Sequence, residues 1–198
     1  MTVPKTLLQA AGASLAPASL RQAAVVIIDA QREYVDGRLP LPGVGPALHV
    51  IAGLLHRARV LDTPILHVVH RGREGGLFDP TTAHFDIADE AAPTGGEPVV
   101  EKGLPNAFAD TDLAGLVKAT GRRDLVLAGF MTHMCISSTA RAATDLGLRV
   151  TIAADACATR DLPGPMGDGV IAAADVHRTA LAELADRFAI VCRAADIS

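Results

Sequence analysis

The segment DLVLAGFMTHMCISSTARAATDLGLRV, residues 124–150, decides the fold class of this chain. Asp124–Phe130 is an apolar run that predicts a strand buried on both faces of a sheet. Small and apolar residues recur at helical spacing over Cys135–Leu146, and Gly147 is typical of the position just beyond a helix. A new strand is predicted from Arg149. The segment therefore predicts a strand–helix–strand unit with a lone cysteine at the start of its helix.

The same alternation of strand and helix patterns extends over most of the chain. Further strands are predicted at Ala23–Asp29, Pro64–His70, Glu97–Lys102, Arg149–Asp155 and Phe188–Cys192, and further helices at Gly45–Leu61, Asp110–Ala119 and Val170–Asp186. Strands that alternate with helices form right-handed βαβ units, so we expect an α/β fold with a parallel, doubly wound sheet. The length of 198 residues predicts a single domain over residues 1–198, with residues 1–20 as an N-terminal extension.

Composition and charge argue against several classes of function. The formal net charge is −4 and no basic block is present, so nucleic-acid binding is not expected. The N-terminal stretch is a poor signal peptide and too short to span a bilayer, so no membrane association is expected. The three cysteines lie far apart without a CxxC pair, which is typical of a reducing compartment and predicts a cytoplasmic protein.

Three chemically useful side chains follow predicted strands of the sheet. Asp29 and Lys102 end two of the runs, and Cys135 comes shortly after a third. Ligands of open parallel sheets bind beyond the carboxyl ends of the strands, so we expect the three to meet there. Taken singly, each has an ordinary structural explanation: a turn aspartate, a packed thiol and a surface lysine. The hypothesis of a site depends on all three reaching the same edge.

An acid, a cation and a thiol form a set that suits nucleophilic catalysis. A helix N-terminus and the charge of Lys102 would both favour the Cys135 thiolate, so we expect the pKa of this thiol to be lowered. Asp29 can accept the thiol proton and later return it to a leaving group. Backbone N–H groups at the strand-to-helix turn are suited to hold an oxyanion.

Four blocks of this sequence resemble the isochorismatase-like cysteine hydrolases, which include nicotinamidases and N-carbamoylsarcosine amidases. The blocks are VVIIDAQREY, EKGLPNAFADTDL, LVLAGFMTHMCISSTARAATDLGLRV and ADACATRD, and the resemblance runs from about Ala23 to Val191. It implies a six-stranded, mainly parallel sheet and an Asp–Lys–Cys triad at Asp29, Lys102 and Cys135. It also implies a non-proline cis peptide at Phe130–Met131, oxyanion donors at the backbone N–H groups of Met131 and Cys135, and an oligomer.

The chain departs from the family members that bind zinc, which carry an aspartate and two histidines after the second strand. Here that place reads HVVHRGREGG, and His67 and His70 are three residues apart on a strand, so they point to opposite faces. His84 and Asp86 are too few to hold an ion by themselves. We therefore expect neither a metal site nor a cofactor.

Other residues near the expected site are candidates for the walls of a substrate pocket: Gln31, Tyr34, Phe108, Phe130 and His133. The irregular stretch Arg71–Thr94 is also expected to contribute, since long loops in compact domains are often functional.

We expect a cysteine-dependent hydrolase of a small amide-like substrate that works through a thioester. Two alternatives stay open: a vinyl ether hydrolase of the isochorismatase type, which can work without the thiol, and a non-catalytic small-molecule binding protein. The high apolar content and the resemblance both predict a homo-oligomer, a dimer or tetramer.

Overall fold

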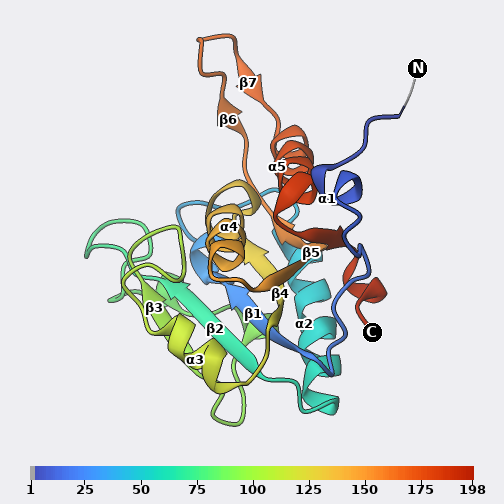
Figure 1. Ribbon diagram of the computed structural model, residues 1–198. Coiled ribbons are helices and arrows are strands. Elements are labelled where there is room, and N and C mark those ends of the chain that lie inside the picture. The colour runs from blue at the N-terminus through green and yellow to red at the C-terminus, as the bar shows by residue number, and fades with distance from the viewer. Residues whose placement is uncertain (1–2) are drawn as a thin grey trace.

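The computed structural model describes residues 3–198 and contains a parallel sheet flanked by helices (Figure 1). The strands of the sheet are β1 (Ala23–Ile28), β2 (Ile65–His70), β3 (Val99–Lys102), β4 (Asp124–Phe130), β5 (Arg149–Ala158) and β8 (Ile190–Cys192). They lie in the order β3-β2-β1-β4-β5-β8, and every neighbouring pair is parallel. The predicted six-stranded, doubly wound sheet is confirmed.

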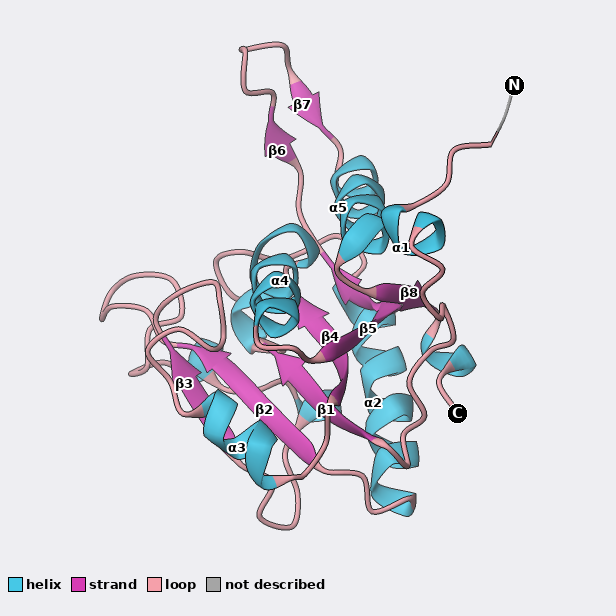
Figure 2. Ribbon diagram, in the orientation of Figure 1, coloured by secondary structure: helices cyan, strands magenta, loops and turns pink. Residues whose placement is uncertain are grey.

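The helices cover both faces of this sheet, as Figure 2 shows. They are α1 (Leu7–Ala10), α2 (Val44–Val60), α3 (Leu113–Ala119), α4 (Ser137–Asp145) and α5 (Ala173–Arg187). The apolar residues of α2 pack on one face, whereas those of α3, α4 and α5 pack on the other. Successive residues of β1 alternate between the two cores, which is why its sequence is apolar throughout. Burial of one valine or isoleucine contributes about 1.5–3 kcal/mol.

A short hairpin of β6 (Leu162–Pro163) and β7 (Val170–Ile171) stands out from the body of the domain (Figure 1). The expectation of a helix from Val170 was therefore wrong by three residues, because β7 occupies Val170–Ile171 and α5 begins only at Ala173. An Asp161 carboxylate oxygen accepts a hydrogen bond from the Ala173 backbone N–H at 2.7 Å and satisfies one open donor at the start of α5.

Other boundaries differ from the predictions by a few residues. α3 begins at Leu113 instead of Asp110, and Asp110 has a positive φ of 56°, which is incompatible with a helix. β5 continues to Ala158, three residues beyond the predicted end, and its register against β4 shifts between Leu127 and Gly129. In the described part of the chain, no helix is long and apolar enough to cross a membrane.

Candidate active site

The strand order places a topological switch point between β1 and β4. The chain runs outward from β1 through β2 to β3, then returns to β4 on the other side of β1 and continues to β5 and β8. A crevice forms beyond the carboxyl ends of strands where the order reverses in this way. Asp29 directly follows β1, and Cys135 follows β4 after a short turn. Both residues therefore lie beside the position where this fold binds ligands.

The turn that carries Cys135 is preceded in β4 by a glycine at a position where any side chain would clash with the backbone. Gly129 has a φ of 121°, and a Cβ atom there would lie 1.9 Å from the carbonyl oxygen of Ile28. The Phe130–Met131 peptide bond that follows is cis. Thr132–Ile136 then forms a wide π-helical turn, closed by a hydrogen bond from the Ile136 N–H to the Met131 carbonyl at 3.2 Å, and continues into α4. Cys135 thus lies at the start of the helical segment.

Asp29 occupies an unusual backbone conformation at the end of β1. Its φ is 51°, in the left-handed region that aspartate tolerates better than most residues. The N–H of Asp29 still donates to the Val68 carbonyl at 2.8 Å, which holds the residue against β2. Its side chain is fully buried.

The Lys102 ammonium connects three buried or half-buried groups. Its Nζ lies 2.7 Å from Asp29 Oδ2 and 3.3 Å from Cys135 Sγ. It also lies 3.2 Å from the ring atom Nδ1 of His70. An ammonium has three N–H donors and no acceptor. Its contacts with Cys135 and His70 are hydrogen bonds, whereas its contact with Asp29 is an ion pair, because neither carboxylate oxygen of Asp29 accepts a hydrogen bond from the described residues. We call the group formed by Asp29, Lys102 and Cys135 the acid–cation–thiol cluster.

The pKa of Cys135 differs from the expectation. Burial raises the pKa of the thiol from 9.0 to about 12, the negative charge of Asp29 adds to the increase, and Lys102 opposes it. The prediction of a lowered pKa was wrong because loss of solvent and a nearby carboxylate outweigh the single cation. Burial likewise raises the pKa of Asp29, while Lys102 lowers it. The thiol is therefore protonated at neutral pH and lies next to a carboxylate with increased basicity.

The structure places the residues predicted to form pocket walls in different surroundings. Gln31 is buried, and its amide bridges backbone groups: Nε2 donates to the carbonyls of His70 and Phe85, and Oε1 accepts from the His70 N–H. The expectation that Gln31 faces the pocket is thus not met, because both of its donors hold loops together. Phe130 is fully buried in the core, 5.8 Å from the Tyr34 ring, so it packs instead of lining a cavity.

The other three candidates are buried or half-buried. Burial raises the pKa of the Tyr34 phenol, and the charges of Asp29 and Cys135 raise it further. Phe108 is half-buried and packs on the core that includes Cys135. His133 is half-buried as well, and its Nδ1 forms a hydrogen bond with the Thr159 hydroxyl.

The contacts of His70 and Arg160 do not follow from the sequence pattern. The opposite orientation of His67 and His70 is confirmed, since His67 contacts Glu97 and His70 contacts Lys102. Arg160 follows β5, and its positive charge lowers the pKa of His133 after the larger effect of burial. No signal in the sequence identifies Arg160, because the predicted strand ends at Asp155 and only the structure extends β5 to Ala158, two residues before Arg160.

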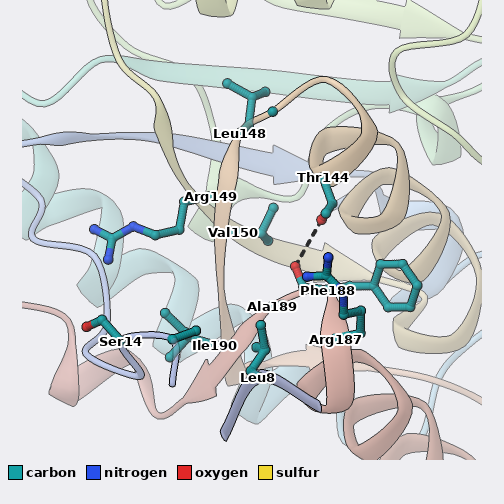
Figure 3. A pocket seen from close by; sticks show the side chains of 12 residues that line it. Leu8, Ser14, Thr144, Leu148, Arg149, Val150, Arg187, Phe188, Ala189 and Ile190 are labelled. Atoms are coloured by element: carbon teal, nitrogen blue, oxygen red, sulfur yellow. Dashed lines mark hydrogen bonds between the residues drawn. The ribbon is translucent and has the colours of Figure 1, made fainter. Parts of the chain in front are cut away.

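Two hollows of the surface lie at opposite ends of β5. A pocket of about 350 Å³ lies at the amino ends of β5 and β8, where a hydrogen bond joins the Thr144 hydroxyl to the Phe188 carbonyl (Figure 3). It contains no acid, histidine or thiol. Another hollow, of about 320 Å³, lies at the carboxyl end of β5 and includes Thr159 and His177. These two residues contact His133 and Thr132, which precede Cys135. Within residues 3–198, no group of three or more histidine, cysteine or acidic side chains is placed to bind a metal ion.

Comparisons with known proteins identify the class to which this fold and cluster belong. Residues 23–196 match the model of the isochorismatase domain. The chain belongs to the isochorismatase family, which confirms the resemblance seen in the sequence.

Individual relatives support this assignment. A crystal structure of an isochorismatase from Pseudomonas putida KT2440 is 43% identical, covers 99% of this chain and 100% of its own, and has a TM-score of 0.95. The secreted isochorismatase effector Isc1 of Verticillium dahliae is 40% identical over 91% of this chain and 93% of its own length. The maleamate amidohydrolase of Pseudomonas putida is 32% identical over 67% of this chain and 70% of its own length. The chain is therefore an isochorismatase-family hydrolase with an amidohydrolase among its relatives.

Proposed function

We propose that this protein is a cysteine-dependent hydrolase that cleaves a small amide through a covalent thioester. The observation that carries the proposal is the position of Lys102 Nζ, within 2.7 Å of Asp29 Oδ2 and 3.3 Å of Cys135 Sγ in a buried site. The cation compensates the buried carboxylate, and it is also placed to stabilise the thiolate when that forms.

The first half of the reaction begins with a protonated thiol. As Sγ of Cys135 attacks the amide carbon, its proton passes to the carboxylate of Asp29, and the charge that develops on sulfur is stabilised by Lys102. The carbonyl oxygen becomes an oxyanion, for which the backbone N–H groups of Met131 and Cys135 are the proposed donors. The C–N bond then breaks, Asp29 returns the proton to the leaving nitrogen, and an acyl thioester remains on Cys135.

The second half uses water and regenerates the enzyme. Asp29, again a carboxylate, accepts a proton from a water molecule that attacks the thioester carbon. The C–S bond breaks, the product acid leaves, and the proton held on Asp29 restores the Cys135 thiol. The raised pKa of Asp29 supports this role, because a general base is most effective when its pKa lies near the working pH.

Arg160 supports a substrate that also carries an anionic group. Its Nε atom is buried and has no hydrogen-bond partner among residues 3–198, and its Nη1 contacts only the carbonyl of the next residue, Asp161, at 3.2 Å. A guanidinium presents a planar set of donors that matches a carboxylate. The name of the maleamate amidohydrolase, a relative that acts on an amide of a dicarboxylic acid, is consistent with this substrate class.

The experiment is a panel of small substrates with the purified protein. It contains neutral amides, amides that carry a carboxylate, and isochorismate, with ammonia release and vinyl ether cleavage as readouts. Carboxylate-bearing amides should be turned over fastest. Cleavage of isochorismate alone would replace the proposal with the vinyl ether hydrolase, which the names of two relatives favour. Tight binding without turnover of any compound would indicate a binding protein.

We further propose that the protein acts in the cytoplasm as a homo-oligomer and uses no metal or cofactor. The three cysteines are all free thiols, which suits a reducing compartment. Exposed apolar side chains on the β6–β7 hairpin, Met166 and Val170, suit a contact with a second subunit. The proposed steps need only side chains and backbone N–H groups of this chain, together with water.

A further inference from the structure

The contact between His70 and Lys102 connects two strand ends. His70 is the last residue of β2 and Lys102 the last residue of β3, and the two are register partners in the parallel ladder. The ring atom Nδ1 of His70 lies 3.2 Å from Lys102 Nζ. The side chain of Lys102 extends from this pair toward Asp29 and Cys135, so His70 contacts the cation without belonging to the acid–cation–thiol cluster.

The direction of this hydrogen bond determines the tautomer of His70. Because an ammonium can only donate, Nδ1 of His70 must accept, and the ring proton lies on Nε2. Burial, followed by the charge of Lys102, lowers the pKa of His70 to about 4. The imidazole is therefore neutral at neutral pH and presents a permanent acceptor to the lysine.

Contacts of the His70 backbone with Gln31, and of the His70 ring with Phe78, hold this residue in place. Gln31 brackets this backbone on both sides: Oε1 accepts from the His70 N–H at 2.8 Å, and Nε2 donates to the His70 carbonyl at 3.1 Å. The ring packs edge-on against Phe78, with centroids 5.1 Å apart. An acceptor held this firmly defines where one of the three donors of Lys102 points.

We propose that His70 is a positioning residue that orients the Lys102 ammonium, so that this ammonium stays paired with the Asp29 carboxylate and keeps its hydrogen bond to Cys135 Sγ. A role of His70 in catalysis rests on the proposed function, but the contact between His70 and Lys102 exists without substrate. Loss of the acceptor would leave a buried N–H group unsatisfied and allow the ammonium to turn away from the sulfur. Stabilisation of the Cys135 thiolate should then decrease.

The test measures the rate at which iodoacetamide alkylates Cys135 at pH 8, followed by mass spectrometry of the peptide that contains this residue. His70→Leu removes the acceptor, and the rate should fall by about tenfold or more, as expected for loss of a hydrogen bond to a charged group. His70→Asn places an amide oxygen as many bonds from the backbone as Nδ1 and should restore the rate to within about threefold of wild type.

His67→Leu is the matched control, because His67 is a buried histidine on the same strand that contacts Glu97 instead of Lys102. This change should lower the melting temperature and leave the alkylation rate within about threefold of wild type. If His70→Leu does not fold, His70→Ala takes its place in the same comparison.

Two results would overturn the proposal: an unchanged rate in the variant that lacks the acceptor, or an equal loss of rate in His67→Leu. Alkylation requires no substrate, so its outcome is independent of whether the amide panel shows turnover. Failure of the positioning role and failure of the proposed function are therefore distinguishable.

Discussion

Replacement of Asp29 by asparagine should make Cys135 more reactive toward an alkylating agent while it abolishes hydrolysis. Asparagine has nearly the same shape and tolerates the left-handed backbone that Asp29 adopts, so the change removes mainly a charge. In the wild type, the negative charge of Asp29 is the second-largest cause of the raised Cys135 pKa, after burial. In the variant, the positive charge of Lys102 acts on the thiol without opposition.

The magnitude follows from the pKa of Cys135. With a pKa of about 12, the thiolate is about one part in ten thousand of the total at pH 8. Two unit charges about 4 Å apart interact by about 4 kcal/mol at an effective dielectric constant of 20. Even a third of that energy would raise the thiolate fraction about tenfold. We expect alkylation of Cys135 to be at least about tenfold faster in Asp29→Asn, whereas amide hydrolysis should fall by about a hundredfold to ten-thousandfold because the general base is absent.

The assay compares iodoacetamide alkylation of the Cys135 peptide over pH 6 to 10 in wild type, Asp29→Asn and Lys102→Met. The lysine variant is the opposing control, because loss of the cation should slow alkylation as well as hydrolysis. The electrostatic reasoning would be refuted if Asp29→Asn reacted with iodoacetamide as slowly as Lys102→Met.

Four other outcomes are expected. Cys135→Ala should abolish amide hydrolysis and keep the fold, whereas Cys157→Ala should change turnover little; retention of more than a few per cent of turnover by the first variant would contradict the covalent mechanism. Activity should survive exhaustive chelation; loss of activity on chelation that is restored by added zinc would contradict the proposal that the protein uses no metal. Sedimentation at micromolar concentration should find a dimer or tetramer of the wild type, and deletion of the tip of the β6–β7 hairpin should weaken this association. A monomeric wild type together with a monomeric deletion variant would refute the proposed assembly. Burial raises the pKa of Glu97, but hydrogen bonds with Arg59, Thr94 and His67 have the larger combined effect and lower this pKa to about 2. The stability that ionised Glu97 contributes is therefore complete above about pH 4.5 and is lost as the pH falls toward 2. Over this pH range, the free energy of unfolding measured by urea denaturation should decrease less in Glu97→Gln than in wild type. An identical decrease in both proteins would contradict this role of Glu97.

The sequence by itself determined the fold class and the members of the cluster. The apolar runs of β1 and β4 can be recognised because strands buried on both faces are apolar along almost their whole length; Asp124, at the partly exposed start of β4, is the exception. A parallel sheet brings the carboxyl ends of its strands to one edge, so Asp29, Lys102 and Cys135 could be placed together before any distance was known. Helix α2 was located within one residue, since its apolar stripe recurs over several turns.

Only the tertiary structure decided the properties that depend on distance and burial. The sign of the Cys135 pKa shift results from competition between burial, the Asp29 carboxylate and the Lys102 ammonium, and residue types alone do not give the strength of each. The acceptor role of His70 likewise requires the register of β2 against β3, which places it beside Lys102. The hairpin of β6 and β7 was not predicted, because strands of two residues are too short to show an alternation of apolar and polar residues. Their antiparallel pairing with each other is what defines them, and this pairing is visible only in the structure.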